Sequence, residues 1–170
     1  MVEVYKMGKT KIKICGLKRP EDIQMVNRLK PDFAGFVFAG SKRKVDKEQA
    51  RKLREALDPD IPAVGVFVNE TIQNVTELCR EKIIQIVQLH GDEDAYYIEE
   101  IRKNLPDIPL IKAVRVQSKE QILEAEKLDV DYLLLDTYVK GQYGGSGTGF
   151  DKALILSLIH ISEPTRHSLI

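Results

Sequence analysis

The chain has 170 residues, 43% of them hydrophobic, and its 26 basic side chains balance its 26 acidic ones. This size and composition predict one globular domain, and without net charge or a basic stripe interleaved with aromatics we expect no nucleic-acid partner. The N-terminus lacks the apolar stretch of a signal peptide, and no later run reaches membrane-spanning length, so we expect a cytoplasmic protein without a membrane partner.

Short apolar runs rich in β-branched residues alternate with segments of helical spacing along most of the chain. The first strand is expected at 11–15, and the helix after it carries Ile23, Val26 and Leu29 on one face. Later strands are expected at 33–38, 63–68, 84–89, 110–116 and 132–135. The helices between them carry apolar stripes at Ala50, Leu53 and Leu57, at Ile72, Val75 and Leu78, at Ile98, Ile101 and Leu105, and at Ile122, Ala125 and Leu128.

Polar residues mark the starts of three of these helices. Asp46 and Thr71 are expected caps, and Ser118 with Gln121 three residues later forms a capping box. Each strand and the helix that follows it are expected to make one right-handed crossover to the next strand. The sequence therefore predicts an α/β fold with parallel strands.

Two architectures are built from such units, an open doubly wound sheet and a closed eight-stranded barrel. Both place functional residues at the carboxyl ends of the strands. No Gly-x-Gly-x-x-Gly follows the first strand, and no Walker phosphate loop occurs in the chain. The sequence therefore argues against a nucleotide-binding open sheet.

Polar side chains do collect at the predicted strand ends. They are Cys15, Asn69, His90, Arg115 and Asp136. A thiolate and a carboxylic acid that face one pocket can remove a proton from one atom and deliver one to another, without a metal or cofactor. Cys15 and Asp136 are therefore the candidate base and acid. With Cys79 as the only other cysteine and no Cys-x-x-Cys spacing, both cysteines are expected as free thiols.

Each of these side chains also has a purely structural interpretation. Cys15 alone can be a small core residue, and Asp136 alone can be a turn or helix cap. His90 can be a histidine with satisfied hydrogen bonds at a strand end, and Arg43 can be a solvated loop charge. Cys79 lies within a helical stripe and is expected in the core.

A series of motifs, taken together, resembles the phosphoribosylanthranilate isomerase family. The similarity covers roughly residues 11 to 154, and the number of motifs in the same order makes it specific. In chain order they are KICGL at 13–17, PED at 20–22, GFVF at 35–38, SKR at 41–43, VGVFVNE at 64–70, VQLHG at 87–91, IKAV at 111–114, LLLDT at 133–137 and YGGSGTGFD at 143–151.

The resemblance implies a cofactor-free (βα)₈ barrel enzyme of tryptophan biosynthesis. Its reaction would be an Amadori rearrangement of N-(5-phosphoribosyl)anthranilate, a phosphosugar, to 1-(2-carboxyphenylamino)-1-deoxyribulose 5-phosphate. Asp136 would be the general acid that protonates the ribose ring oxygen, and Cys15 the base that removes the C2 proton. Arg43 would bind the anthranilate carboxylate, for which a bidentate guanidinium is well shaped. No metal is implied.

The same resemblance assigns further residues to the substrate pocket. His90 is one of them. Gly144 and Gly145 belong to the glycine-rich segment 143–149, which is expected to act as a lid over the substrate but can equally be a linker. Lys13 lies two residues before Cys15 on the same strand face, so we hypothesise that its ammonium group stabilises the thiolate.

The chain departs from the family pattern near its C-terminal end. Position 152 is Lys where the family usually has Trp, and from about residue 156 the similarity stops. We expect residues 1–155 to form a partial barrel with about six parallel βα units. Residues 156–170 are expected to be an artefactual non-family tail that resembles translated sequencing-adapter DNA. The alternative is a divergent sixth helix, which Pro164 disfavours.

A partial barrel has consequences for activity and association. Barrels of this kind hold the substrate phosphate with loops after strands seven and eight, so we expect little isomerase activity from the chain as it stands. The alternative is an inactive barrel fragment. Open edges on the first and sixth strands are expected to promote self-association. A different phosphosugar barrel enzyme, such as an epimerase or indoleglycerol-phosphate synthase, is a further alternative, and the latter needs catalytic Lys and Glu residues at strand ends.

Overall fold

The computed structural model describes residues 11–137, 168 and 169. These residues form one parallel sheet with helices packed against it. The elements follow in the order β1 (Lys13–Cys15), α1 (Pro20–Leu29), β2 (Phe33–Val37), α2 (Lys47–Ala56), β3 (Ala63–Phe67), α3 (Ile72–Arg80), β4 (Ile86–Leu89), α4 (Ala95–Asn104), β5 (Leu110–Val116), α5 (Lys119–Ala125), β6 (Tyr132–Thr137) and β7 (Ser168–Leu169).

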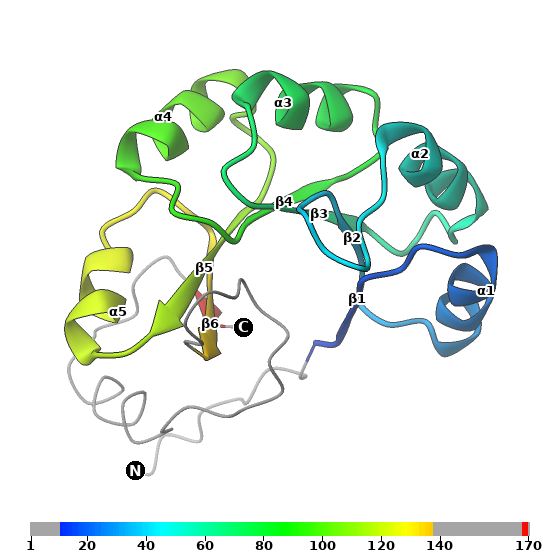
Figure 1. The fold of residues 1–170 in the computed structure, drawn as a ribbon, viewed down its shortest axis with the longest axis horizontal. Coiled ribbons are helices and arrows are strands. Elements are labelled where there is room, and N and C mark those ends of the chain that lie inside the picture. The colour runs from blue at the N-terminus through cyan, green and yellow to red at the C-terminus, as the bar shows by residue number, and fades with distance from the viewer. Residues whose placement is uncertain (1–10, 138–167, 170) are drawn as a thin grey trace, which may run out of the picture.

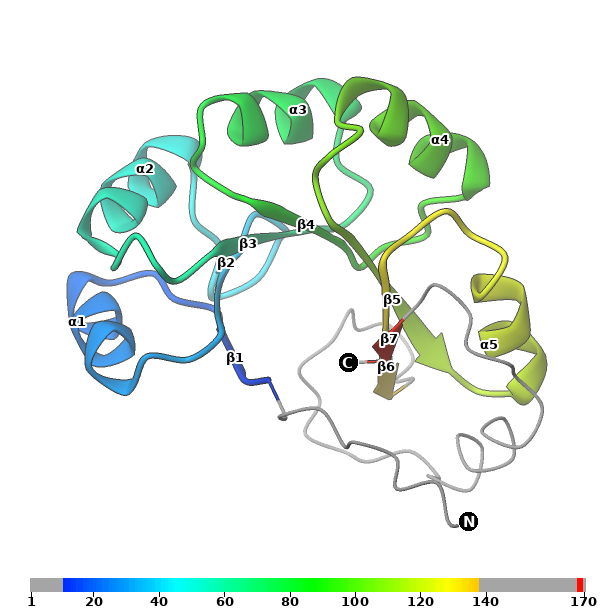
Figure 2. The same ribbon diagram turned by 180° about the vertical axis from the view of Figure 1, so that it is seen from behind.

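The strands lie side by side in chain order, and each pairs in parallel with the next. Figure 1 shows that the sheet curves into an arch with α1 to α5 on its convex side, and Figure 2 shows the same arrangement from behind. β1 lies at one end of the arch and β6, with the short β7 beside it, at the other. This architecture is a partial (βα)₈ barrel and confirms the fold class predicted from the sequence.

Two strands begin later than predicted. β1 begins at Lys13 rather than at 11, because the backbone N–H of Ile12 donates to the side chain of Asp32 at 2.8 Å. β4 begins at Ile86 rather than at 84, because the N–H groups of residues 83 and 84 donate to the carbonyl of Leu78 near the end of α3. In both cases a hydrogen bond outside the strand ladder takes the donor that the predicted strand needed.

The helix starts predicted at Asp46, Thr71 and Ser118 are confirmed. The side chains of Asp46 and Thr71 each accept from the backbone N–H three residues later, at 2.8 and 3.3 Å. Gln121 accepts from the N–H of Ser118 at 3.3 Å, as a capping box requires. Asp94 caps α4 in the same way at 2.9 Å and was not predicted. No helix within the described part of the chain is both long and apolar enough to cross a membrane.

The strand register assigns alternate side chains to two faces of the sheet. Cys15 pairs with Gly35, Gly35 with Val64, and Val64 with Ile86, so these residues share the concave face. Apolar side chains of this face pack into one cluster inside the arch. Its members are Val64, Ile86 and Ile111, with Phe33, Tyr132 and Leu134 against them.

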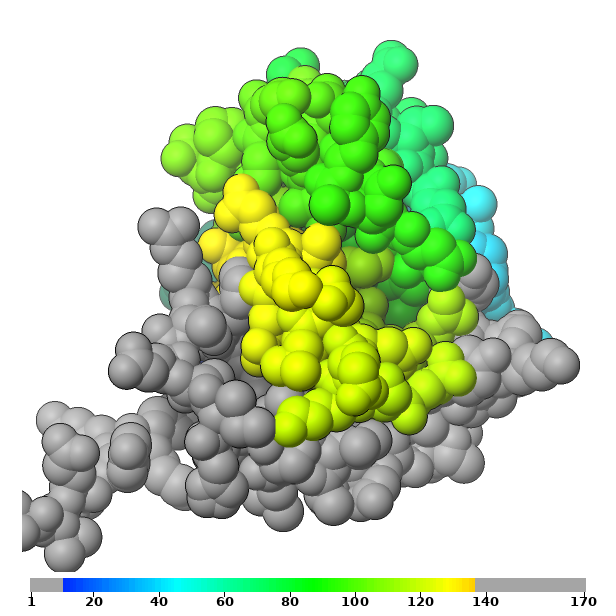
Figure 3. Space-filling view, turned by 90° about the vertical axis from the view of Figure 1, so that its left-hand side faces the viewer, coloured from blue at the N-terminus to red at the C-terminus, as the bar shows by residue number. Residues whose placement is uncertain are grey.

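The larger apolar core lies between the sheet and the helices. Ile23 and Val26 of α1 are buried in it as predicted, but Leu29, the third residue of the first predicted stripe, is 63% exposed at the end of the helix. Cys79 is buried as predicted. Phe38 stacks on Phe67 with 5.1 Å between the ring centroids. Figure 3 shows α4 (green) and the α5 segment (yellow) next to each other on one face of the molecule. The helices thus hold the curvature of the sheet from outside.

Candidate active site

The structure places four of the predicted site residues at strand ends or in the loop after a strand. Cys15 is the last residue of β1, and His90 directly follows β4. Asp136 lies within β6, which extends to residue 137 rather than ending at 135 as predicted. Arg43 lies in the loop between β2 and α2. These positions agree with the expectation that functional side chains gather at the carboxyl ends of the strands.

The other two predicted site residues, Gly144 and Gly145, lie outside the described residues. The rest of the glycine-rich segment 143–149 lies outside them as well, and so does the segment from 156 onward apart from residues 168 and 169. The substrate lid and the non-family tail therefore stay predictions.

Close packing between β1 and β2 sets the position of the Cys15 thiol. A Cβ atom at Gly35, its partner in β2, would lie 2.6 Å from the Sγ atom and 3.0 Å from the Cα atom of Cys15. A larger residue at position 35 would therefore displace the thiol or the backbone of β1. Cys15 is partly exposed, whereas Cys79 is buried, and burial raises the pKa of the Cys79 thiol to about 12. Cys15 is thus the accessible thiol of the two.

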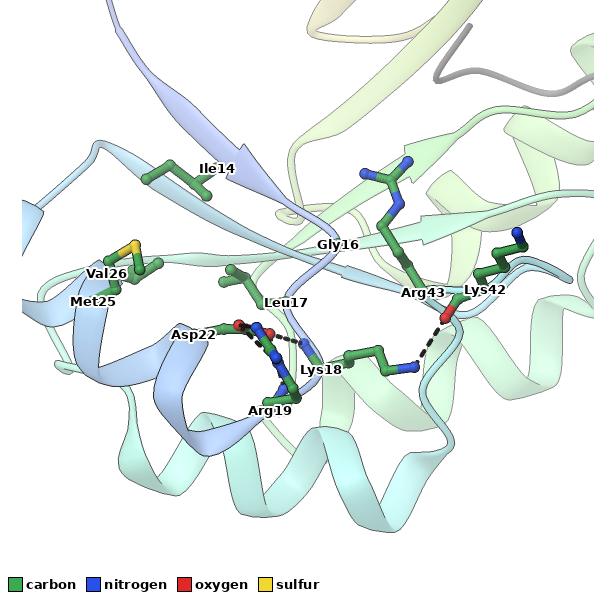
Figure 4. A pocket seen from close by; sticks show the side chains of 10 residues that line it. All are labelled: Ile14, Gly16, Leu17, Lys18, Arg19, Asp22, Met25, Val26, Lys42 and Arg43. Carbon is green, nitrogen blue, oxygen red and sulfur yellow. Dashed lines mark hydrogen bonds and ion pairs between the residues drawn. The ribbon is translucent and has the colours of Figure 1, made fainter.

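Arg43 reaches the end of β1 by crossing Gly16. Gly16 has a φ angle of 90°, which favours glycine, and a Cβ atom there would lie 2.5 Å from the Cδ atom of Arg43. The Nη1 atom of Arg43 donates to the carbonyl oxygen of Cys15 at 3.4 Å. Figure 4 shows this side chain beside Gly16, apart from the ion pair of Arg19 with Asp22 in the same cleft. The guanidinium therefore lies next to the backbone of the candidate base.

A row of polar side chains connects β1, β4 and β6 across the concave face, and we call it the interior polar row. The ammonium group of Lys13 contacts the Oε1 atom of Gln88. The Nε2 atom of Gln88 lies 2.9 Å from the Nδ1 atom of His90, and the Nε2 atom of His90 lies 3.0 Å from the Oδ2 atom of Asp136. Gln88 is 2% exposed, and the side chain of His90 is 12% exposed. The row thus joins the strand of the candidate base to the candidate acid.

Burial is the main influence on the two basic groups of this row. It lowers the pKa of Lys13, an effect that the negative charge of Cys15 opposes. Burial also lowers the pKa of His90, against the hydrogen bond and charge of Asp136 and together with the charges of Lys13 and Lys112. His90 is therefore neutral near pH 7. The attraction between Lys13 and Cys15 is what thiolate stabilisation by Lys13 requires, and that hypothesis stays a prediction.

Two residues of the site, Gln88 and Gly35, were not predicted. Gln88 carries a detectable signal, because it is a polar residue within an apolar strand and lies two positions before His90, on the same face. Gly35 lies inside a predicted strand, where glycine often marks a close approach of another backbone or ligand. Their partners come from other strands, so neither role follows from local spacing.

Two further polar residues at strand ends contribute to loop packing. Asn69 accepts from the backbone N–H of Asp92 at 2.8 Å and has a φ angle of 51°. Arg115 forms an ion pair with the side chain of Asp92 at 2.6 Å. Both contacts hold the loop that follows His90, and so they support the position of the site.

The side chains gathered on the concave face and at the carboxyl ends of the strands are suited to proton transfer and anion binding. They provide a thiol, an imidazole, a carboxyl, an ammonium and a guanidinium group. Within residues 11–137, 168 and 169, no group of three His, Cys, Asp or Glu side chains could hold a metal ion. A thiol on β1 and a carboxyl on β6 can act as base and acid on one bound molecule.

The sequence matches the family model of N-(5'phosphoribosyl)anthranilate (PRA) isomerase over residues 12–167. Two curated relatives carry the name N-(5'-phosphoribosyl)anthranilate isomerase. The protein of Lachnoclostridium phytofermentans is 52% identical over 145 residues, which cover 85% of this chain and 66% of the relative. That of Acetivibrio thermocellus is 51% identical over 147 residues, covering 84% and 67%. The chain thus spans about two thirds of the length of these relatives.

Solved structures of phosphoribosylanthranilate isomerases resemble the arch. The Thermus thermophilus protein has a TM-score of 0.75 and 32% identity, covering 89% of this chain and 72% of its own. The Thermotoga maritima protein has a TM-score of 0.75 and 33% identity, covering 88% and 72%. A third structure, in complex with reduced 1-(o-carboxyphenylamino)-1-deoxyribulose 5-phosphate, has a TM-score of 0.71 and 32% identity, covering 88% and 70%.

Proposed function

The chain belongs to the N-(5'-phosphoribosyl)anthranilate isomerase family, and we propose that its site serves the isomerisation of N-(5'-phosphoribosyl)anthranilate in tryptophan biosynthesis. One observation carries this proposal beyond the family match. The interior polar row joins β1, the strand that ends in the thiol of Cys15, to the carboxyl of Asp136 in β6, so a base and an acid serve one concave face. The complex of a relative with a reduced carboxyphenylamino-deoxyribulose phosphate supports a phosphosugar as the substrate.

In this proposal, Asp136 acts as the general acid. It protonates the ring oxygen of the ribose, the C1–O bond breaks, and the lone pair of the nitrogen forms an iminium ion. Cys15 as its thiolate removes the proton from C2, and the electron pair of that bond forms an enolamine and neutralises the nitrogen. Protonation at C1 and loss of the enol proton then give the ketone. No atom is gained or lost, so proton transfer is all the chemistry that the site must provide.

Arg43 is proposed to bind the carboxylate of the anthranilate group. Its guanidinium lies beside the carbonyl of Cys15, and its planar pair of donors matches a carboxylate. A substrate held there would have its ribose within reach of the concave face. The proposal also includes a substrate-binding role for Gly144 and Gly145 and a lid formed by residues 143–149. The support for both is the resemblance to the family.

The proposal is tested by turnover of N-(5'-phosphoribosyl)anthranilate and by growth of a tryptophan auxotroph that lacks the isomerase. Each assay uses the chain alone and the chain extended by two further βα units from the L. phytofermentans relative. We expect little activity from the chain alone, because phosphate binding in such barrels depends on the later loops. In the extended protein, Cys15→Ala and Asp136→Asn should each lower kcat/KM by about 10²- to 10⁴-fold.

Cys79→Ala is the matched control, since it removes the other thiol from the helical side of the sheet and should leave kcat/KM within a few-fold of the parent. Absence of turnover in the extended parent protein would overturn the isomerase proposal and favour the inactive fragment. Retained activity in Cys15→Ala or Asp136→Asn would overturn the assigned roles. The cytoplasmic location expected from the sequence stays a prediction.

We also propose that the chain self-associates through the β1 edge of its sheet. The edge of β6, which was expected to be open, pairs with β7 at residues 132 and 133. Within the described residues, β1 pairs only with β2, and backbone groups along a strand edge are a template for pairing with another chain. The T. maritima relative is described as dimeric, which supports association within the family but not this interface. Sedimentation should show the average mass rising with concentration, and a single monomer species at high concentration would exclude the proposal.

A further inference from the structure

Lys13 stands at one end of the interior polar row and can donate hydrogen bonds but not accept them. This fixes the direction of every hydrogen bond in the row. A lysine ammonium group can only donate, so the Gln88 atom that faces Lys13 must be the amide oxygen. The amide nitrogen of Gln88 must then face the Nδ1 atom of His90, at 2.9 Å. An amide nitrogen only donates, so Nδ1 must be the unprotonated nitrogen of the ring.

The remaining bond of the row follows from the tautomer. A neutral imidazole whose Nδ1 atom accepts carries its proton on Nε2. That Nε2–H group lies 3.0 Å from the Oδ2 atom of Asp136 and donates to it. The Oδ2 atom of Asp136 is thus the acceptor of a hydrogen bond from His90.

We propose that Gln88 and Lys13 are positioning residues of the isomerase site, which hold His90 as the neutral Nε2–H tautomer and so make it a hydrogen-bond donor to Asp136. The assignment of Asp136 as the acid rests on the proposed function, whereas the tautomer of His90 does not. Lys13 also attracts the charge of Cys15, so one ammonium group serves both the base and, through two side chains, the acid.

The surroundings of His90 favour the neutral ring that the row requires. Burial disfavours the charged imidazolium, and the ammonium groups of Lys13 and Lys112 add to this effect. Asp136 is the charged group that opposes them, through both its hydrogen bond and its charge. A buried imidazole keeps one tautomer when each of its ring nitrogens has a hydrogen-bond partner of fixed polarity. Gln88 provides the donor to Nδ1, and Asp136 provides the acceptor for Nε2.

The test is nitrogen-15 NMR of the histidine rings in the intact chain, which needs no turnover. The chain has three histidines, and the His90 signals are assigned by their loss in His90→Gln. We expect Nδ1 of His90 to give the shift of an unprotonated ring nitrogen and Nε2 that of an N–H at pH 7. A proton on Nδ1, or a charged ring at pH 7, would overturn the proposal without bearing on the isomerase reaction.

Gln88→Glu reverses the polarity of the row with almost no change of shape. The new carboxylate accepts from Lys13 and needs a donor at Nδ1, so His90 should become Nδ1-protonated and its pKa should rise by about 1 to 3 pH units. Gln88→Met removes the donor to Nδ1, so the pKa of His90 should rise, whereas Asp136 still favours a proton on Nε2. Gln73→Glu makes the same chemical change at an exposed position on α3 and should leave the His90 signals unmoved.

A second measurement separates positioning from a structural role. In an active extended protein, Gln88→Glu should shift the pH profile of kcat with less effect on KM, whereas Gln73→Glu should not. If Gln88→Glu does not fold, the ring signals of the parent and of Gln88→Met decide the question. Unchanged tautomer and pKa of His90 in a folded Gln88→Glu or Gln88→Met protein would overturn the roles of Gln88 and Lys13.

Discussion

A buried ion pair between Glu93 and Lys112 ties the loop after β4 to β5, and its disruption should be the most destabilising single change outside the apolar core. The two side chains are 1% and 9% exposed, with 2.8 Å between the carboxylate and the ammonium group. The Glu93 carboxylate also accepts from the backbone N–H groups of Asn69 and Gly91, at 2.8 and 2.9 Å. It therefore fastens the loop that directly follows the site.

Glu93→Gln keeps the shape of this side chain but replaces one acceptor oxygen by a donor. On the Oε2 side, the new amide nitrogen would face both the N–H of Gly91 and the ammonium group of Lys112. Leaving a buried charge without its partner costs about 3 to 5 kcal/mol. Against a total free energy of unfolding of about 5 to 15 kcal/mol for a domain, this loss is large.

The two partners should not be equivalent. Lys112→Met leaves the Glu93 carboxylate with its two backbone N–H donors, whereas Glu93→Gln leaves the ammonium group with only the carbonyl of Gly91. We therefore expect a smaller loss for Lys112→Met, and a double variant that loses less than the sum of the two. Urea unfolding followed by circular dichroism measures all three values.

Glu124→Gln is the matched control. Glu124 pairs with Lys127 at 2.6 Å, but the two side chains are 71% and 68% exposed. The same chemical change should cost about 0.5 kcal/mol or less there, because water screens an exposed pair. A loss below about 1 kcal/mol for Glu93→Gln, or a larger loss for Lys112→Met, would refute the reasoning.

Three further predictions concern the site. One equivalent of a thiol reagent should modify the native protein at Cys15, whereas Cys79 should react only after unfolding. Mass spectrometry of the labelled peptides checks this, and equal labelling of the two cysteines would contradict it. Because its folded-state pKa is lowered, His90 should titrate below about pH 6.5 by NMR. It should therefore contribute stability above that pH, which is lost as the pH falls through its folded value. Gly35→Ala should slow thiol labelling or shift the β1 resonances, because a Cβ would lie 2.6 Å from Sγ, and an unperturbed β1 would exclude this.

The positions of Cys15 and Asp136 near the ends of strands could be predicted because hydrophobic periodicity is a local property. The caps at Asp46 and Thr71 were predicted for the same reason, since a cap and the N–H group that it accepts from are three residues apart. Asp94 acts identically but stands among other acidic residues, so its role did not stand out in the sequence.

Contacts between distant segments could not be predicted in this way. Gln88 meets Lys13 across 75 residues, and His90 meets Asp136 across 46. Lys112 lies in an apolar strand, and nothing within that strand indicates a partner 19 residues earlier. Such pairs depend on how far the sheet curves and on the strand register, and both are products of the whole fold.

Because each strand pairs with the next strand in the chain, the loops that must close during folding have similar lengths. Paired residues in β1 to β6 are separated by 20 positions between Lys13 and Phe33 and by 29 between Ala34 and Ala63, with the other pairs in between. The entropic cost of closing these loops differs by only about 0.3 kcal/mol. No single closure is therefore a bottleneck, and the arch can assemble by successive additions, each of which adds one strand and one covering helix to an edge already formed.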